Sequence, residues 1–241
     1  MATFLVAHGA WSAGWVWKKM RPLLRERGHE LFTPTYTGVG ERVHLAAPDV
    51  GLTTHIADVL AVLEFEDLHD VTLIGHSYGG MVATGVADRA PQRIAQLVYL
   101  DAFVPRDGQS LDSLCAAQVR SRMSNAVHGN ADEWRIPPNP LPTDTLPEDV
   151  GWITPRRVMQ PRKTFEEPIR ITRVVDGLPK TYVYCTRVEP GDAFRPFAER
   201  ARSEPGWRYL ELDASHSPHV TAPQALADLL DRIVLRGTNQ Q

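Results

Sequence analysis

The sequence lacks several features that mark specialised classes of protein. Only two of its 241 residues are cysteine, Cys115 and Cys185, so we expect no disulfide framework and predict that both thiols are buried as small apolar groups. No hydrophobic run approaches the roughly 20 residues that span a bilayer, and the first residues lack the positive region of a signal peptide. We therefore expect a cytoplasmic protein with no membrane partner.

Neither sign of charge is in large excess, since the formal net charge is only −3. This balance argues against nucleic acid as a main partner. The histidines show no His-Glu-x-x-His pattern and no Cys/His ligand spacing, so no metal is expected. A dinucleotide fingerprint is absent too, so no cofactor is expected. Monomer and homodimer both stay open.

What the sequence does contain is an alternation of short apolar runs and helix-length amphipathic stretches. The runs predicted as strands are Phe4–Ala7, Glu30–Thr33, Val71–Ile74, Ile94–Leu100, Thr181–Cys185 and Trp207–Leu212. Helices are predicted over Thr54–Leu68, Tyr78–Arg89 and Pro223–Leu235. This pattern predicts an α/β fold with a mostly parallel sheet of about six strands and helices on both faces.

The stretch from Pro105 to Pro179 interrupts the alternation and is rich in proline. Long irregular excursions inside a compact domain are usually functional. Apolar residues such as Trp134 and Trp152 give this stretch something to bury. We predict a core made of residues 1–104 and 180–241, with residues 105–179 inserted as a cap over a site at the carboxyl edge of the sheet.

One motif carries a specific chemistry. Gly75-His76-Ser77-Tyr78-Gly79 follows a buried strand and opens a helix. This arrangement is the nucleophile elbow of the α/β-hydrolase fold, in which the serine hydroxyl projects above the sheet from a strained turn. We therefore predict Ser77 as the nucleophile and His76, which flanks it, as structural.

A serine hydroxyl needs a base, which in this fold follows the last strand. Leu210–Ser215 gives a strand and a short loop that lead to His216, the predicted base, while His219 is interpreted as a polar loop or pocket residue. The oxyanion needs two backbone donors, and the residue after the nucleophile supplies one. We predict the N–H groups of Tyr78 and of Ala10, in the loop after the first strand.

The acid of the triad has three candidates. Asp101 directly follows the strand that ends at Leu100, whereas Glu189 and Asp192 lie in the loop after Cys185. Both loops open on the same edge of the predicted sheet, so the residues alone leave the three open.

Four segments resemble one known group of proteins: His8-Gly9-Ala10-Trp11, Trp17…Pro22-Leu23-Leu24…Gly28-His29, Gly75-His76-Ser77-Tyr78-Gly79-Gly80-Met81 and Tyr182-Val183-Tyr184-Cys185-Thr186. They are similar to the plant methyl-ester esterases and hydroxynitrile lyases and to related bacterial esterases. The resemblance implies the α/β-hydrolase fold, Ser77 as nucleophile, His216 as base, and Ala10 with Tyr78 as oxyanion donors.

Two departures from that group refine the expectation. The plant proteins carry an aspartate just after the Cys-Thr pair, where this sequence has Val188. The segment after Leu100 instead resembles haloalkane dehalogenases, whose acid follows the preceding strand, so we predict Asp101 as the acid. The lyases depend on a threonine beside the first-strand histidine and a lysine after the catalytic histidine. Gly9 and Ser217 stand there, which favours an esterase.

The leading hypothesis is therefore hydrolysis of a small to medium ester, lactone or thioester through an acyl-enzyme on Ser77. Two alternatives stay open: a pathway-specific deacylase or cyclase acting on an aromatic or polyketide product, and a small-molecule receptor on a hydrolase fold. Trp11, Phe103 and Trp152 are predicted to bind substrate, because aromatic side chains line many small-molecule pockets.

Overall fold

The computed structural model describes residues 1–117, 120–121, 132–172, 174–188 and 191–237. Its centre is a six-stranded sheet with the order β2-β1-β3-β4-β7-β8, in which every neighbouring pair is parallel. The strands are β1 (Thr3–Ala7), β2 (Glu30–Phe32), β3 (Val71–His76), β4 (Ile94–Leu100), β7 (Lys180–Cys185) and β8 (Trp207–Leu212). All six predicted strands are present, and the predicted α/β architecture is confirmed.

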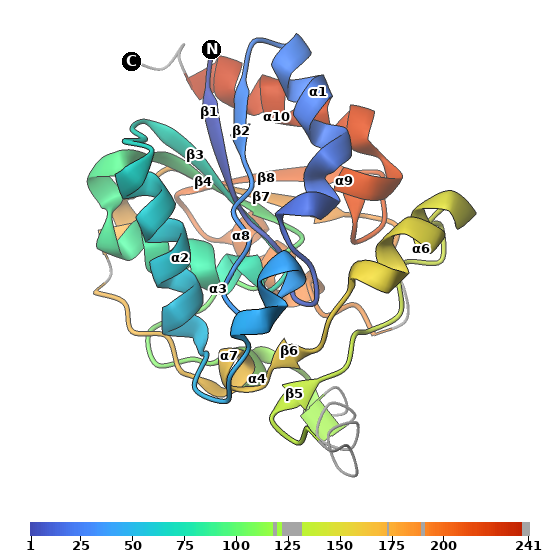
Figure 1. Ribbon diagram of the computed structural model, residues 1–241. Coiled ribbons are helices and arrows are strands. Elements are labelled where there is room, and N and C mark those ends of the chain that lie inside the picture. Colours follow the sequence, from blue (N-terminus) through green and yellow to red (C-terminus); the bar gives the residue numbers. More distant parts are fainter. Residues whose placement is uncertain (118–119, 122–131, 173, 189–190, 238–241) are drawn as a thin grey trace.

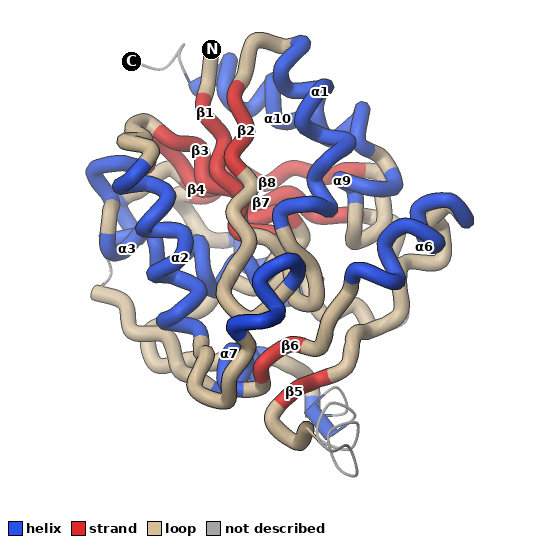
Figure 2. Tube along the Cα trace, viewed as in Figure 1, coloured by secondary structure: helices blue, strands red, loops and turns tan. Residues whose placement is uncertain are grey.

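Helices cover both faces of the sheet (Figures 1 and 2). They are α1 (Met20–Glu26), α2 (Leu52–Phe65), α3 (Gly79–Arg89), α8 (Arg195–Ser203), α9 (Pro218–Thr221) and α10 (Pro223–Gly237). Alternate residues of each strand point to opposite faces. In β4, Leu97 and Tyr99 therefore join the core under α2, α3 and α8, whereas Val98 and Leu100 join the core under α1, α9 and α10.

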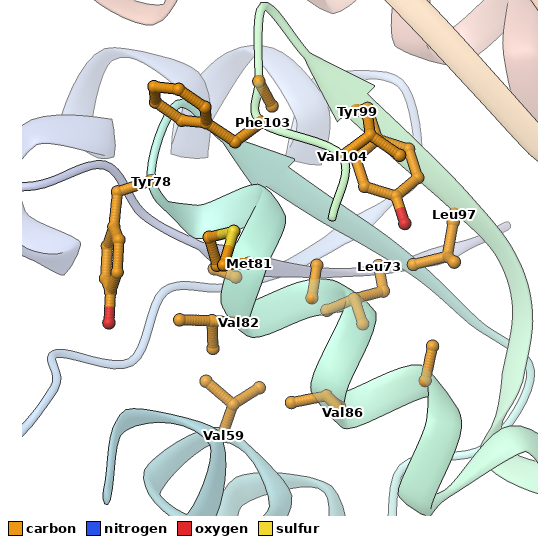
Figure 3. Close-up of a cluster of buried hydrophobic side chains, with 14 of the residues drawn as sticks. Val59, Leu73, Tyr78, Met81, Val82, Val86, Leu97, Tyr99, Phe103 and Val104 are labelled. Carbon is orange, nitrogen blue, oxygen red and sulfur yellow. The ribbon is translucent and has the colours of Figure 1, made fainter. Parts of the chain in front are cut away.

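Helix α3 is buried on almost every side. Met81, Val82 and Val86 pack between the sheet and Val59 of α2 (Figure 3). A helix that is apolar all round is one that has no face in solvent. This packing fixes the start of α3, and with it the turn that carries Ser77.

The chain reverses its winding direction between β1 and β3, which are neighbours in the sheet although β2 separates them in sequence. In open parallel sheets, ligands bind beyond the carboxyl ends of the strands at such a point. The loop after β1 begins at His8 and the turn after β3 begins at Ser77. The two predicted oxyanion segments thus leave the sheet side by side.

Residues 105–179 add no strand to the main sheet in their described part. They form short elements: α4 (Leu111–Leu114), β5 (Arg135–Ile136), α6 (Pro147–Ile153), β6 (Gln160–Pro161) and α7 (Lys163–Glu166). Strands β5 and β6 pair antiparallel with each other. In Figure 1, α7, β5 and β6 lie at the end of the molecule opposite the start of β1. This is the end at which the strand-to-helix loops open.

Candidate functional site

Ser77 lies on a strained turn between β3 and α3. Its φ of 56° falls in the left-handed region that non-glycine residues seldom adopt. The turn is possible because the backbone of α3 approaches its neighbours closely. A Cβ on Gly79 would lie 1.9 Å from the carbonyl oxygen of Ala7, and one on Gly80 would lie 2.0 Å from that of Phe103. The two glycines therefore allow the helix to start where the serine needs it.

Three side chains from distant parts of the sequence form one hydrogen-bonded chain. The Oγ atom of Ser77 lies 3.0 Å from Nε2 of His216, and Nδ1 of His216 lies 2.7 Å from Oδ2 of Asp101. A carboxylate can only accept a hydrogen bond, so Nδ1 carries the proton and Nε2 is left to accept from the serine hydroxyl. This is the arrangement by which a base activates a serine.

The backbone conformation of Asp101, its burial and one hydrogen bond fix its carboxylate beside His216. It follows β4 with a φ of 43°, its residue is 4% exposed, and its Oδ1 atom accepts the Cys185 N–H at 3.3 Å. Burial raises the pKa of its carboxyl group, and the hydrogen bond from His216 opposes that rise. The hydrogen bond from His216 therefore offsets part of the cost of burying the Asp101 carboxylate. The same hydrogen bond orients the His216 ring.

The other two candidates for the acid are Asp192 and Glu189. Asp192 accepts the Tyr184 hydroxyl at 2.6 Å and pairs with Arg195 at 3.2 Å, so its carboxylate is used elsewhere. Glu189 lies outside the described residues. Among the described carboxylates, Asp101 is the one that bonds to His216.

Two contacts hold His216 in place, one to its ring and one to its backbone. Its ring stacks on Phe194 with a centroid distance of 4.6 Å and an interplanar angle of 9°. Its backbone carbonyl accepts Nε2–H of His76 at 2.7 Å. His76, which we predicted to be structural, thus contacts the backbone of His216 rather than the serine hydroxyl.

His219, which we interpreted as a polar loop or pocket residue, lines the pocket but lies in a helix and not in a loop. It lies within α9, is 3% exposed, and stacks on Trp17 at 4.6 Å. The difference arises because Pro218 starts a helical turn before the predicted helix at Pro223. His219 still lines the cavity described below.

The two predicted oxyanion donors face the same space. Among the described residues, no acceptor bonds to the backbone N–H of Ala10 or of Tyr78, whereas the N–H of Trp11 donates to Oε1 of Gln160 at 3.1 Å. Ala10 and Tyr78 both line the cavity around Ser77. Two N–H groups without a described acceptor, beside a serine hydroxyl, are what stabilisation of an oxyanion would require.

A hydrogen bond to the buried His55 fixes the side chain of Tyr78. The Tyr78 hydroxyl lies 2.9 Å from Nδ1 of His55, and Nε2 of His55 lies 3.0 Å from the carbonyl oxygen of Thr37. The carbonyl can only accept, so Nε2 carries the proton and Tyr78 donates to Nδ1. Sequence reasoning missed His55, which falls among apolar residues of α2 and carries no motif.

The cavity above Ser77 has a volume of about 430 Å³. The core supplies Trp11, Ser77, Phe103 and His216 to its lining, and residues 105–179 supply Leu111, Cys115, Asn139, Pro140, Leu141, Pro142, Thr145, Ile153, Arg157 and Phe165. Phe103 and Tyr78 project from adjacent loops at the start of α3 (Figure 3). Residues 105–179 therefore contribute much of the cavity wall.

Of the three residues predicted to bind substrate, Trp11 and Phe103 line this cavity and Trp152 does not. The Trp152 indole packs edge-on against Trp15 at 5.2 Å and carries the Lys18 ammonium 3.4 Å from its ring centroid. Helix α6 presents Ile153, the next residue, to the cavity instead of Trp152.

Buried histidines should make the fold sensitive to acid. Burial lowers the pKa of His8 to about 4 and those of His55 and His219 to about 3, and it also lowers the pKa of His76. Below about pH 6.5 the unfolded chain takes up protons that the folded chain refuses, so the free energy of unfolding falls as pH falls towards about 4. Each such group contributes roughly 1.4 kcal/mol per pH unit in that window.

We therefore expect the urea midpoint to be flat above about pH 7 and to drop steeply between about pH 6.5 and 4. The check is a series of urea denaturation curves followed by tryptophan fluorescence. A midpoint that stays constant down to about pH 4 would contradict the assignment of neutral, buried imidazoles.

Comparison with known proteins identifies the family. The sequence matches the alpha/beta hydrolase family over residues 4–229. The chain belongs to the α/β-hydrolase family. The resemblance predicted from its motifs is confirmed as well, since methylesterase 2 of Arabidopsis thaliana is 30% identical over 104 residues, which are 42% of this chain and 40% of that protein.

Longer matches come from other members of the α/β-hydrolase family. The carbendazim hydrolyzing esterase of Nocardioides sp. is 39% identical and covers 95% of this chain and 98% of its own. The pyrethroid hydrolase of Sphingobium wenxiniae is 34% identical over 94% of this chain and 85% of its own. A solved extracellular alpha/beta-hydrolase from a Paenibacillus species superposes with a TM-score of 0.83 at 26% identity, covering 96% and 98%. This hydrolase-family chain is accordingly a carboxylic ester hydrolase.

Among the described residues, no three His, Cys, Asp or Glu side chains are grouped as metal ligands would be. No described helix is both long and apolar enough to cross a membrane.

Proposed function

We propose that this enzyme hydrolyses small to medium carboxylic esters through a covalent acyl-enzyme on Ser77. The observation that carries the proposal is the continuous hydrogen-bonded chain Ser77–His216–Asp101 on the wall of the cavity. Its esterase relatives support the same chemistry.

In the acylation half, Ser77 Oγ attacks the ester carbonyl carbon while its proton passes to His216 Nε2. Asp101 stabilises the imidazolium that results, without taking the proton itself. The negative charge that develops on the carbonyl oxygen is met by the N–H groups of Ala10 and Tyr78. Collapse of this intermediate breaks the ester C–O bond, and His216 returns the proton to the departing alcohol.

In the deacylation half, water replaces the alcohol. His216 takes a proton from the water as its oxygen attacks the acyl carbon of the Ser77 ester. The second tetrahedral intermediate uses the same two N–H donors. When it collapses, Ser77 regains its proton from His216 and the carboxylic acid leaves. The cycle thus consumes one ester and one water and restores the enzyme.

The cap is part of the proposal. Residues 105–179 form, in this account, an insertion on the core of residues 1–104 and 180–241, and they set substrate choice. The apolar side chains that this stretch contributes to the cavity, among them Leu111, Ile153 and Phe165, support that role. Aromatic walls at Trp11 and Phe103 favour esters with an aryl or other flat group.

Hydroxynitrile lyase activity is not supported by the residues at the two positions where the lyases carry a threonine and a lysine. Gly9 and Ser217 both line the cavity, and neither carries the ammonium group that would stabilise a departing cyanide ion. Deacylation of a natural product would use the same triad, so it differs from the main proposal only in the size of the acyl group.

A panel of p-nitrophenyl esters of rising acyl length, together with aryl esters, lactones and carbendazim, tests the proposal. We expect kcat/KM to peak at short to medium acyl chains, because a cavity of about 430 Å³ cannot enclose a long one. Absence of turnover for every ester in the panel, by folded protein, would overturn the proposed function.

A further inference from the structure

One charged group in the cavity has no role in the chemistry above. Arg157 lies in the inserted stretch between Arg156 and the start of β6, and it lines the same cavity as Ser77. Its guanidinium carbon lies 6.0 Å from the centroid of the Trp11 indole, in the oxyanion loop. A cation is therefore part of the wall of the cavity that holds Ser77.

The other charged side chains that line the cavity each have a partner of opposite charge. Asp101 bonds to His216, Asp192 pairs with Arg195, and Arg187 pairs with Asp213. Arg157 pairs with no carboxylate in the part of the chain that the structure describes; its guanidinium donates to the backbone carbonyl of Asn139. The cavity lining therefore has one positive charge that no described carboxylate neutralises.

Arg157 is half-buried, and even partial burial of an unpaired charge is costly. A cation that leaves water without a counter-ion loses hydration that a single neutral acceptor does not replace. Burial accordingly lowers the pKa of Arg157 to about 10, so the group is still protonated at neutral pH. A guanidinium has five N–H donors in a planar fork, and a carboxylate accepts two of them at once. An anion on the substrate would supply the missing partner.

The neighbours of Arg157 indicate which part of the substrate it would contact. Trp11 follows Ala10, the proposed oxyanion donor, and its indole Nε1–H is anchored to the carbonyl of Ile136 at 2.9 Å. The guanidinium carbon lies 6.0 Å from the centroid of that indole and belongs to residues 105–179, not to the loop after β1. Because the N–H groups of Ala10 and Tyr78 are assigned to the reacting carbonyl, the guanidinium is available to a second group on the substrate.

We propose that Arg157 selects esters that carry a second, anionic group, and specifically a free carboxylate, as in the half-esters of dicarboxylic acids. This inference rests on the proposed ester hydrolysis at Ser77 and adds the substrate class to it. Arg157 acts as a binding residue that pairs with the substrate carboxylate.

The experiment compares two matched series of substrates. Monomethyl esters of dicarboxylic acids from four to eight carbons are assayed beside the same esters with the free acid converted to a primary carboxamide. The carboxamide has nearly the same shape and no charge. For the wild type we expect kcat/KM to favour the carboxylate by at least about tenfold at the best chain length, as for other charge-assisted hydrogen bonds.

Variants connect that preference to the residue. In Arg157→Gln the ratio of carboxylate to carboxamide kcat/KM should fall to about one or below, and Arg157→Lys should keep part of it, since an ammonium lacks the planar fork. Arg156→Gln is the matched control, because Arg156 is exposed, bonds to the Trp152 carbonyl and lies outside the cavity lining. It should keep the full preference.

The results separate the two proposals. Hydrolysis of both series with equal kcat/KM, or a preference that survives unchanged in Arg157→Gln and Arg157→Lys, overturns the role of Arg157 and leaves ester hydrolysis standing. If the wild type hydrolyses esters of the panel above but neither series, the role of Arg157 is overturned and ester hydrolysis stands. If it hydrolyses neither series and no ester of the panel, the proposed function itself is overturned.

Discussion

Ser77→Ala should lower kcat for ester hydrolysis by about 10⁶-fold, because removal of a triad serine removes the covalent route altogether. Stopped assays on p-nitrophenyl esters, with protein expressed free of any wild-type enzyme, measure the loss. Retention of more than a few per cent of the wild-type rate would contradict the role of Ser77 as nucleophile.

The strained backbone at Ser77 suggests a second variant that serves as the control for folding. At a φ of 56° an alanine keeps the steric cost of its Cβ, whereas a glycine does not. Ser77→Gly should therefore lose activity to the same degree as Ser77→Ala while unfolding at an equal or higher urea concentration. Such a pair separates loss of the hydroxyl from loss of structure.

Asp101→Asn should lower kcat by about 10⁴-fold while leaving the fold intact, by analogy with triads whose acid is made neutral. An asparagine at this position can donate to His216 Nδ1, which reverses the tautomer and removes the acceptor site at Nε2. Asparagine also tolerates the φ of 43° found here, so little strain is added. Steady-state kinetics and a urea midpoint for the same preparation give the two readouts.

Asp192→Asn is the matched comparison for the acid. Its carboxylate accepts from Tyr184 and pairs with Arg195 instead of His216, so we expect a loss in kcat at least about 100-fold smaller than that of Asp101→Asn. If Asp192→Asn were the more damaging change, or if Asp101→Asn kept kcat within tenfold, the acid would have to be reassigned.

The sheet and the elbow could be predicted from sequence because both are local. Strand β4, Ile94–Leu100, has the predicted bounds, since a buried parallel strand is a continuous apolar run. The position of Ser77 follows from glycines two residues before and after it, each needed for a close backbone approach. Signals of this kind lie within a few residues of the feature that they predict.

The contacts that sequence reasoning missed join residues far apart in the chain. Arg157 and Trp11 are neighbours in space, as are Phe194 and His216, but no periodicity connects them. Trp152 was assigned to the cavity because the inserted stretch has no regular pattern from which to tell which side chain faces inward. In such a stretch, the packing of Trp15 and Lys18 decides the orientation.

The most direct test of the account is to trap the covalent intermediate. Aryl N,N-dimethylcarbamates transfer a carbamoyl group that serine hydrolases release slowly, so the wild-type protein can be digested and mapped by mass spectrometry after reaction. We predict about one equivalent of phenol released per chain and the carbamoyl group on Ser77, with no adduct in Ser77→Ala. An adduct on any other residue, or equal labelling of Ser77→Ala, would contradict the proposed mechanism.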